Sequence, residues 1–293
     1  MCSDRPTVGA RLSTSMKLPV LPQFLSPILA AGLSLVATAH VHVQIGFPAG
    51  QWDLHVLDYE AGPFAPAEYP LVVGAAARQR VPDDPRFTSA LGLAGGPVWI
   101  LPQNEAAGLL NLGVGTSGIS AGVFAGNQLR LELRHVEGPG DFALFSISPF
   151  GAPTVHLASR DGTDPAVDFL TVPAVNGHLH VNWAFTAPGT YRVGLAARGT
   201  LAATGQSAVS PVTEYVFVVP APQAPVLGTP RLLADGSVEL IVTGSAGALV
   251  EIQAAPVPGV WAPLGSLRAS GAPQTFSVPA SVATQRFFRA YMP

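Results

Sequence analysis

The sequence predicts an all-β protein with a large N-terminal β-sandwich followed by a small β-sandwich of the immunoglobulin or fibronectin type. Glycine and proline are both frequent, with 31 and 29 of the 293 residues, and they divide the chain into short segments. Many of these segments alternate between apolar and polar residues, which is the pattern of a half-buried strand. Strands joined by turns therefore explain the sequence better than long helices do.

The N-terminal segment 16–39 has the features of a secretory signal peptide. Lys17 gives it a basic start, an apolar run extends through Val36, and Ala37-Thr38-Ala39 fits the small-residue pattern of a cleavage site. We interpret residues 1–39 as an upstream extension and a signal peptide. This predicts an exported protein, in the periplasm, at the cell surface or outside the cell, whose mature chain has no transmembrane span.

Removal of this segment has two chemical consequences. The single cysteine, Cys2, would be lost, so the mature chain would have neither a disulfide framework nor a thiolate zinc site. Cleavage after Ala39 would also make His40 the N-terminal residue, and it would then offer both an α-amine and an imidazole to a metal.

Four of the seven histidines form two His-x-His pairs, His40/His42 and His178/His180. Each pair lies in an alternating segment, and residues i and i+2 of a strand point to the same face of a sheet. Each pair thus presents two imidazoles side by side. Because neutral imidazole is the commonest side-chain ligand of metals, the two pairs predict a metal site.

A neighbouring segment adds Asp53 and His55 to the candidates. Residues 52–57 alternate, and Pro48-Ala-Gly50 supplies a turn before them, so 40–57 is predicted to form a β-hairpin. If the polar faces of its strands coincide, both residues lie near His42. The predicted ligands are His40, His42, Asp53, His55, His178 and His180.

Imidazole ligands favour zinc, which takes a tetrahedral shell with nitrogen atoms at about 2.0–2.1 Å. Copper(II) is the alternative, because it binds the same nitrogens more tightly by the usual order. Asp53 would be a ligand or an acceptor that orients a histidine. The sequence contains no His-Glu-x-x-His, phosphate-loop or dinucleotide-binding motif, and we predict no catalytic residue.

The first domain is predicted to span 40–219. Segment 177–185 alternates most cleanly, with Leu179, Val181 and Trp183 on its core face. Residues 61–128 are expected to be rich in loops and turns. The other strands expected after this region lie at 129–136, 142–147, 154–157, 190–195 and 215–219.

Residues 220–225 are proline-rich and predict a stiff linker. The following module, 226–293, has four alternating segments, at 236–242, 248–253, 274–278 and 286–291. It contains no histidine, so we expect it to act as a spacer or docking module.

Several segments, in order, resemble the bacterial surface-anchored proteins of the choice-of-anchor M family, over roughly residues 40–198. The resemblance implies metal capture at the cell surface, with a metal-uptake ABC transporter or cell-surface components as partners. The chain departs from the family at Ala290-Tyr-Met-Pro293, which carries no hydrophobic tail or sorting signal. The segments are 40–47, Gln51-Trp-Asp-Leu-His55, Val81-Pro-Asp-Asp-Pro85, Pro97-Val-Trp-Ile-Leu-Pro102, 136–142 and 177–191.

The function predicted from these features is an exported cell-surface or periplasmic protein that binds a transition metal, preferably zinc, in metal acquisition. Two alternatives stay open: a structural or adhesion protein without metal, and a copper enzyme that uses an N-terminal His40. The net charge is −3 and no basic stripe is present, which argues against nucleic acid as a partner.

Overall fold

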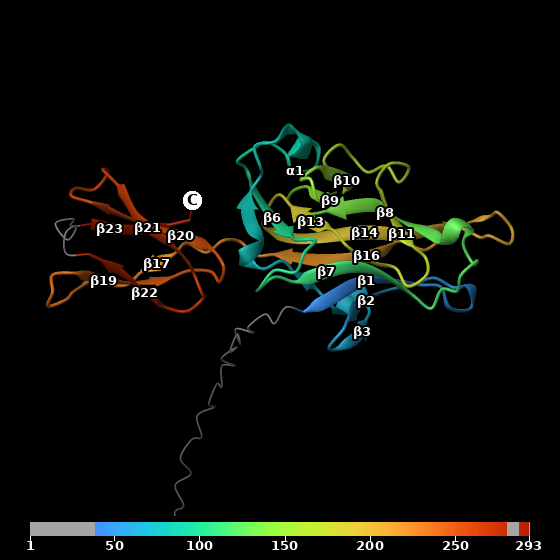
Figure 1. Ribbon diagram of the computed structural model, residues 1–293, viewed down its shortest axis with the longest axis horizontal. Helices are drawn as coiled ribbons and strands as arrows, with labels where there is room; N and C mark the ends of the chain where they lie inside the picture. Colours follow the sequence, from blue (N-terminus) through green and yellow to red (C-terminus); the bar gives the residue numbers. More distant parts are fainter. Residues whose placement is uncertain (1–38, 280–286, 293) are drawn as a thin grey trace, which may run out of the picture. The chain divides into compact units, whose positions relative to one another are not determined.

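The structure is a computed structural model that describes residues 39–279 and 287–292. The predicted all-β class is confirmed: these residues form strands, short 3-10 turns and one α-helix, α1 (Thr88–Leu91) (Figure 1). The predicted signal peptide and upstream extension lie outside the described residues, apart from Ala39. The 3-10 turns are η1 (Pro48–Gly50), η2 (Pro66–Glu68), η3 (Ala75–Ala77), η4 (Pro85–Phe87) and η5 (Ala125–Asn127).

Residues 40–219 form three sheets, of five, five and six strands. From one edge to the other, the first sheet consists of β12 (His178–His180), β7 (Asn111–Ser117), β1 (His40–Gly46), β2 (Asp53–Asp58) and β3 (Gly62–Phe64). The second consists of β10 (Pro153–Ala158), β9 (Phe142–Ile147), β13 (Asn182–Phe185), β6 (Pro97–Leu101) and β5 (Arg78–Arg80). The third consists of β11 (Phe169–Pro173), β8 (Gln128–Glu137), β14 (Gly189–Thr200), β16 (Thr213–Val219) and β4 (Leu71–Val72), with β15 (Ser207–Val209) beside β14.

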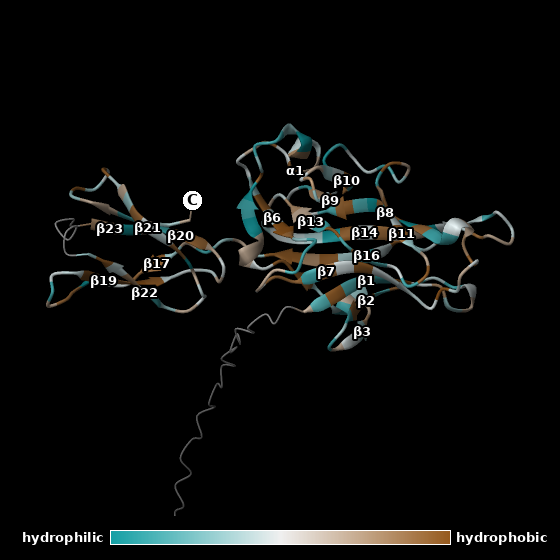
Figure 2. Cartoon of the chain, in the orientation of Figure 1, coloured by the Kyte–Doolittle hydropathy of each residue, from teal (hydrophilic) through white to brown (hydrophobic). Residues whose placement is uncertain are grey.

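One apolar core joins the three sheets. Val43 of the first sheet, Trp183 of the second and Phe217 of the third are fully buried in the same cluster. Figure 2 shows hydrophobic stretches in both β14 and β16. The second sheet is also covered on its other face, where Ile100 and Phe145 belong to a separate cluster with residues of α1. On β1 of the first sheet, the positions that point away from the common core carry polar side chains, and two of them, His42 and Gln44, are themselves buried.

The predicted β-hairpin is confirmed. β1 and β2 are antiparallel, and His42 lies opposite Leu57 while Gln44 lies opposite His55. The inward residues of β1, including Val41 and Ile45, are completely buried. The alternating pattern therefore places the histidines of β1 on the outward face of the sheet.

The prediction of one strand over 177–185 is wrong. β12 pairs with β7 in the first sheet, whereas β13 pairs with β6 and β9 in the second. The change of sheet occurs at Val181, and Leu179, Val181, Trp183 and Phe185 all border the same core. Since both sheets turn their inward faces to one core, the apolar alternation continues although the pairing partner changes.

The interpretation of 61–128 as loop-rich did not identify the strands in this region, of which β6 and β7 are the longest. In β7, Leu112 and Val114 are fully buried, and the positions between them and after them are Gly113 and Gly115. Glycine weakens a strand pattern because it offers no side chain to pack. The strand therefore does not show the polar alternation that identifies its neighbours.

Residues 226–291 contain two further sheets with their own core. One is ordered β17 (Val226–Leu227), β19 (Val238–Thr243) and β18 (Arg231–Leu232), with β22 (Gln274–Val278) also on β19. The other is ordered β21 (Ala262–Arg268), β20 (Leu249–Ala255) and β23 (Phe287–Tyr291). Leu240, Val250 and Ile252 are completely buried between them. The exact boundaries of the domains and linker stay predictions.

A search of the described residues finds no helix with the length and hydrophobicity that a membrane span requires.

Candidate metal centre

The structure brings the two His-x-His pairs together. One nitrogen atom from each of His40, His42, His178 and His180 lies within 4.8 Å of the others. The Nε2 atom of His40 is 3.1 Å from that of His42 and 3.2 Å from that of His180. The Nε2 atoms of His178 and His180 are 3.0 Å apart. We call these four residues the histidine tetrad.

The tetrad forms across β7, which lies between β1 and β12. His42 is in register with Gly113 on one side, and His180 is in register with Gly113 on the other. Neighbouring strands are about 4.8 Å apart, so the two histidine strands are separated by about 9.6 Å. The rings therefore meet above the backbone of β7. Figure 1 shows β7, β1 and β2 as adjacent strands.

Glycine is required where the rings cross β7. A Cβ atom on Gly113 would lie 2.7 Å from both Cδ2 and Nε2 of His42, and one on Gly115 would lie 2.6 Å from Nδ1 of the same ring. These separations are shorter than carbon and nitrogen atoms tolerate. Gly113-Val-Gly115 is therefore part of the site, although sequence reasoning missed it. Its only signal was two glycines at a spacing of two, the period of a strand.

Tyr59 is a second residue that sequence reasoning missed. Its ring stacks on His40 with a centroid separation of 4.5 Å and an interplanar angle of 12°. Its hydroxyl lies 3.3 Å from Nδ1 of His42. The hairpin places it there, because the backbone N–H of Tyr59 donates to the carbonyl of His40 at 3.0 Å. The hairpin register, once known, would have identified this neighbour.

Burial keeps the inner rings of the tetrad neutral at pH 7. His42 is only 1% exposed, and burial, followed by the adjacent His178 ring, lowers its pKa to about 3. Burial lowers the pKa of His180 to about 4, again with a further contribution from His178. Burial also lowers the pKa of His40, while Glu105 acts in the opposite direction. Neutral rings offer lone pairs, which is the state that a metal requires.

Hydrogen bonds among the four imidazoles cannot account for all of their close nitrogen contacts. Each imidazole nitrogen carries either a proton or an in-plane lone pair. Nε2 of His40 has two Nε2 neighbours, and so does Nε2 of His180, so the three contacts among the tetrad cannot all be good hydrogen bonds at once. A single cation would accept all four lone pairs, and the four residues could therefore hold a metal ion.

Asp53 and His55 lie apart from this group. Nδ1 of His55 is 3.2 Å from a carboxylate oxygen of Asp53, so the two residues contact each other. His55 faces Gln44, one outward position further along the hairpin than His42. Neither is among the residues that converge on the tetrad. The polar faces of β1 and β2 do coincide, as expected. The ring of His55, however, lies opposite Gln44, one outward position beyond His42, and therefore does not join the tetrad.

The remaining residues with a predicted or conceivable role are engaged elsewhere. Asn182, on the strand that follows His180, is buried and accepts a hydrogen bond from the backbone of Gln103 at 3.0 Å. His135 lies 3.5 Å from Glu214, and the His156 ring contacts the hydroxyl of Ser146 at 3.0 Å. These contacts are consistent with structural roles.

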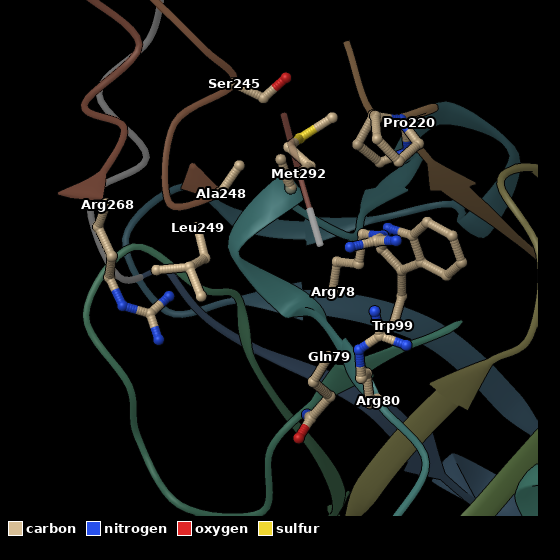
Figure 3. A pocket seen from close by; sticks show the side chains of 12 residues that line it. Arg78, Gln79, Arg80, Trp99, Pro220, Ser245, Ala248, Leu249, Arg268 and Met292 are labelled. Atoms are coloured by element: carbon tan, nitrogen blue, oxygen red, sulfur yellow. The ribbon is translucent and has the colours of Figure 1, made fainter. Parts of the chain in front are cut away.

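A pocket elsewhere lies beside β5 and β6 (Figure 3). The guanidinium of Arg78 is 6.0 Å from the centre of the Trp99 ring, and Gln79 and Arg80 also line the pocket. None of its lining residues is a histidine or a carboxylate. This pocket therefore adds no ligand to the metal centre and no acid or base of its own.

Comparison of the chain with protein-family models finds no match, and comparison with curated proteins finds no relative. The geometry of the tetrad is accordingly the main support for a function.

Proposed function

We propose that this chain is an exported cell-surface or periplasmic protein that binds a transition metal, preferably zinc, through the histidine tetrad and serves metal acquisition. The convergence of four imidazoles from two separate strands is the observation that carries the proposal. The apolar run before His40 and the resemblance to the choice-of-anchor M family support the export and acquisition parts.

The nitrogen spacings support zinc. A tetrahedral shell with bonds of about 2.0–2.1 Å places neighbouring nitrogens about 3.3 Å apart. The Nε2 contacts of 3.0–3.2 Å are close to this value, so small ring movements would admit the ion. Copper(II) would bind the same nitrogens and is the competing ion.

The placement of the tetrad favours an exchangeable ion. His178 is exposed, whereas His42 beneath it is buried, so an ion would enter from the solvent side. The four ligands are neutral and would leave the charge of a divalent ion uncompensated. Such an ion is easier to release than one held by thiolates or carboxylates. A metal-uptake transporter is the partner that this behaviour suits.

The test is metal analysis and zinc titration of the exported protein. We expect one bound zinc per chain in the wild type, and at least a hundredfold weaker binding in His178→Ala/His180→Ala, because half of the shell is removed. The matched control is His135→Ala/His156→Ala, which removes two histidines outside the tetrad. Equal zinc binding by the wild type and the tetrad variant would refute the proposal.

The same titration distinguishes the alternatives. Absence of bound metal in the wild type would favour a structural or adhesion protein. Stoichiometric copper with oxidant-dependent turnover would favour a copper enzyme. N-terminal sequencing of protein recovered from the exterior tests the export step, and a chain that stays in the cytoplasm would contradict it.

A further inference from the structure

A second polar site lies on the outward face of the third sheet. Arg130 of β8 stands directly opposite Arg198 of β14, and Thr171 of β11 stands opposite Arg130 on its other side. Like charges directly opposite each other on neighbouring strands are destabilising. This pair of guanidinium groups therefore needs compensation by a nearby anion.

The chain supplies only part of that compensation. Glu132 is buried and accepts from Nε of Arg198 at 2.5 Å and from Nη1 of Arg134 at 2.8 Å. Both oxygens of this carboxylate are engaged by Arg198 and Arg134, so it forms no ion pair with Arg130. Charge-assisted hydrogen bonds of this kind are strong, so the charge of Glu132 is committed to Arg198 and Arg134.

Arg130 is the arginine that remains available. Its guanidinium carbon lies 3.9 Å from the centre of the Phe169 ring. Within the described part of the chain, Arg130 makes this contact with the Phe169 ring but forms no hydrogen bond or ion pair. Stacking fixes the plane of the guanidinium and leaves its N–H edges directed away from the ring. The group is therefore held ready for a planar oxyanion.

A cavity of about 360 Å³ lies beside the two arginines. This volume falls at the lower end of the range of about 300–1,000 Å³ that is typical of small-molecule sites. Besides Arg130 and Arg198, its lining includes Gln128, Thr171 and Thr200, which offer amide and hydroxyl groups. Such a lining suits a ligand with several hydroxyl groups and one negative charge.

We infer that this cavity binds an acidic sugar residue, with its carboxylate between the guanidinium groups of Arg130 and Arg198 and its hydroxyls on the threonine and glutamine side chains. The carboxylate would supply the missing counter-charge, and Arg130 would donate a pair of hydrogen bonds to it. Arg198 already donates through Nε to Glu132 and through Nη1 to Ser207, so it would donate to the ligand through Nη2. The site uses no residue of the tetrad and does not depend on metal binding.

The test is titration calorimetry of the whole chain with a galacturonic acid trimer, a neutral galactose trimer and inorganic phosphate. We expect the acidic trimer to bind, the neutral trimer not to bind, and phosphate to bind at least tenfold more weakly than the acidic trimer. Arg130→Gln should weaken binding of the acidic trimer at least tenfold. This variant removes no internal ion pair, so the fold should be kept, and thermal unfolding checks that it is.

The matched control is Arg192→Gln, which removes an exposed arginine on the same strand β14, where it pairs with Glu214 at 3.2 Å. Binding should be unchanged in this variant. Equal binding of the neutral trimer, no binding of the acidic trimer at millimolar concentration, or unaltered binding by Arg130→Gln would overturn the inference. Phosphate binding as tight as that of the acidic trimer would overturn the assignment to a sugar.

Discussion

His42 and His55 stand on neighbouring strands, on the same face of the same sheet, in segments of similar alternation, yet only His42 joins the tetrad. The difference lies in the strands beside them. His42 has Gly113 next to it on β7, which leaves room for rings from both sides. His55 has Gln44 opposite it on β1 and contacts Asp53 instead. A local pattern thus presents a histidine, but the size of the residue on the next strand decides whether it meets others.

The largest expected effect contrasts these two histidines directly. His42→Ala should weaken zinc binding about a hundredfold or more, because it removes the buried member of the shell. His55→Ala should change the affinity by less than about threefold, since this ring lies outside the group. Zinc titration by calorimetry measures both. Similar losses in the two variants would mean that the ion sits between them.

The glycines of β7 provide the next comparison. Gly113→Ala should displace the ring of His42 and cost about 1–3 kcal/mol in the free energy of unfolding, the usual cost of overpacking. Zinc affinity should fall with it. Gly46→Ala is the control, because a Cβ atom there would be at least 3.4 Å from its nearest neighbour. Urea unfolding and zinc titration of both variants make the measurement. Unchanged stability and zinc affinity in Gly113→Ala would show that the histidine rings do not need the space above this glycine.

The depressed pKa values predict a dependence on pH in the metal-free protein. His42 and His180 have pKa values of about 3 and 4 in the folded chain, against an ordinary value of 6.5. As the pH falls below 6.5, the unfolded chain takes up protons that the folded chain does not, so the free energy of unfolding decreases. Most of this loss should be complete near pH 4, and solvent screening limits it for the partly exposed ring of His180.

Urea unfolding between pH 7 and pH 4 checks this expectation. The variant His178→Ala/His180→Ala should show a shallower dependence. It lacks one of the two strongly shifted rings, and it also lacks the His178 neighbour that adds to the effect of burial on the pKa of His42. Equal slopes in the wild type and the variant would place the pH dependence on other groups.

The smallest expected effect concerns Tyr59. Its hydroxyl lies where it can accept the Nδ1 proton of His42, which would keep the lone pair on Nε2 directed into the tetrad. Tyr59→Phe keeps the ring stacked on His40 and removes only the hydroxyl, so zinc affinity should fall about tenfold, in the lower part of the range for partners of metal ligands. Tyr69→Phe is the control, because that hydroxyl donates to Asp58 at 2.5 Å instead. Zinc titration measures both, and an unchanged Tyr59→Phe would leave the tyrosine only a packing role.

Alternation, turn residues and spacing were sufficient to predict the all-β class, the β1–β2 hairpin and the two histidine pairs. These features are local: a strand has a period of two, so the sequence alone determines which residues share a face. The same reasoning failed at Val181, where the chain changes sheets without a change in its apolar pattern. It also failed at β7, where glycines occupy the outward positions and conceal the strand.

The sequence by itself determined that His40 pairs with His42 and His178 with His180, because neighbours two residues apart lie side by side on any strand. Only the tertiary structure decided that β7 separates the pairs, that its glycines let the rings meet, and that Asp53 and His55 stay apart. The physical reason is that strand order and register result from packing the three sheets on one core. That packing depends on contacts between residues far apart in the chain, which no local pattern records.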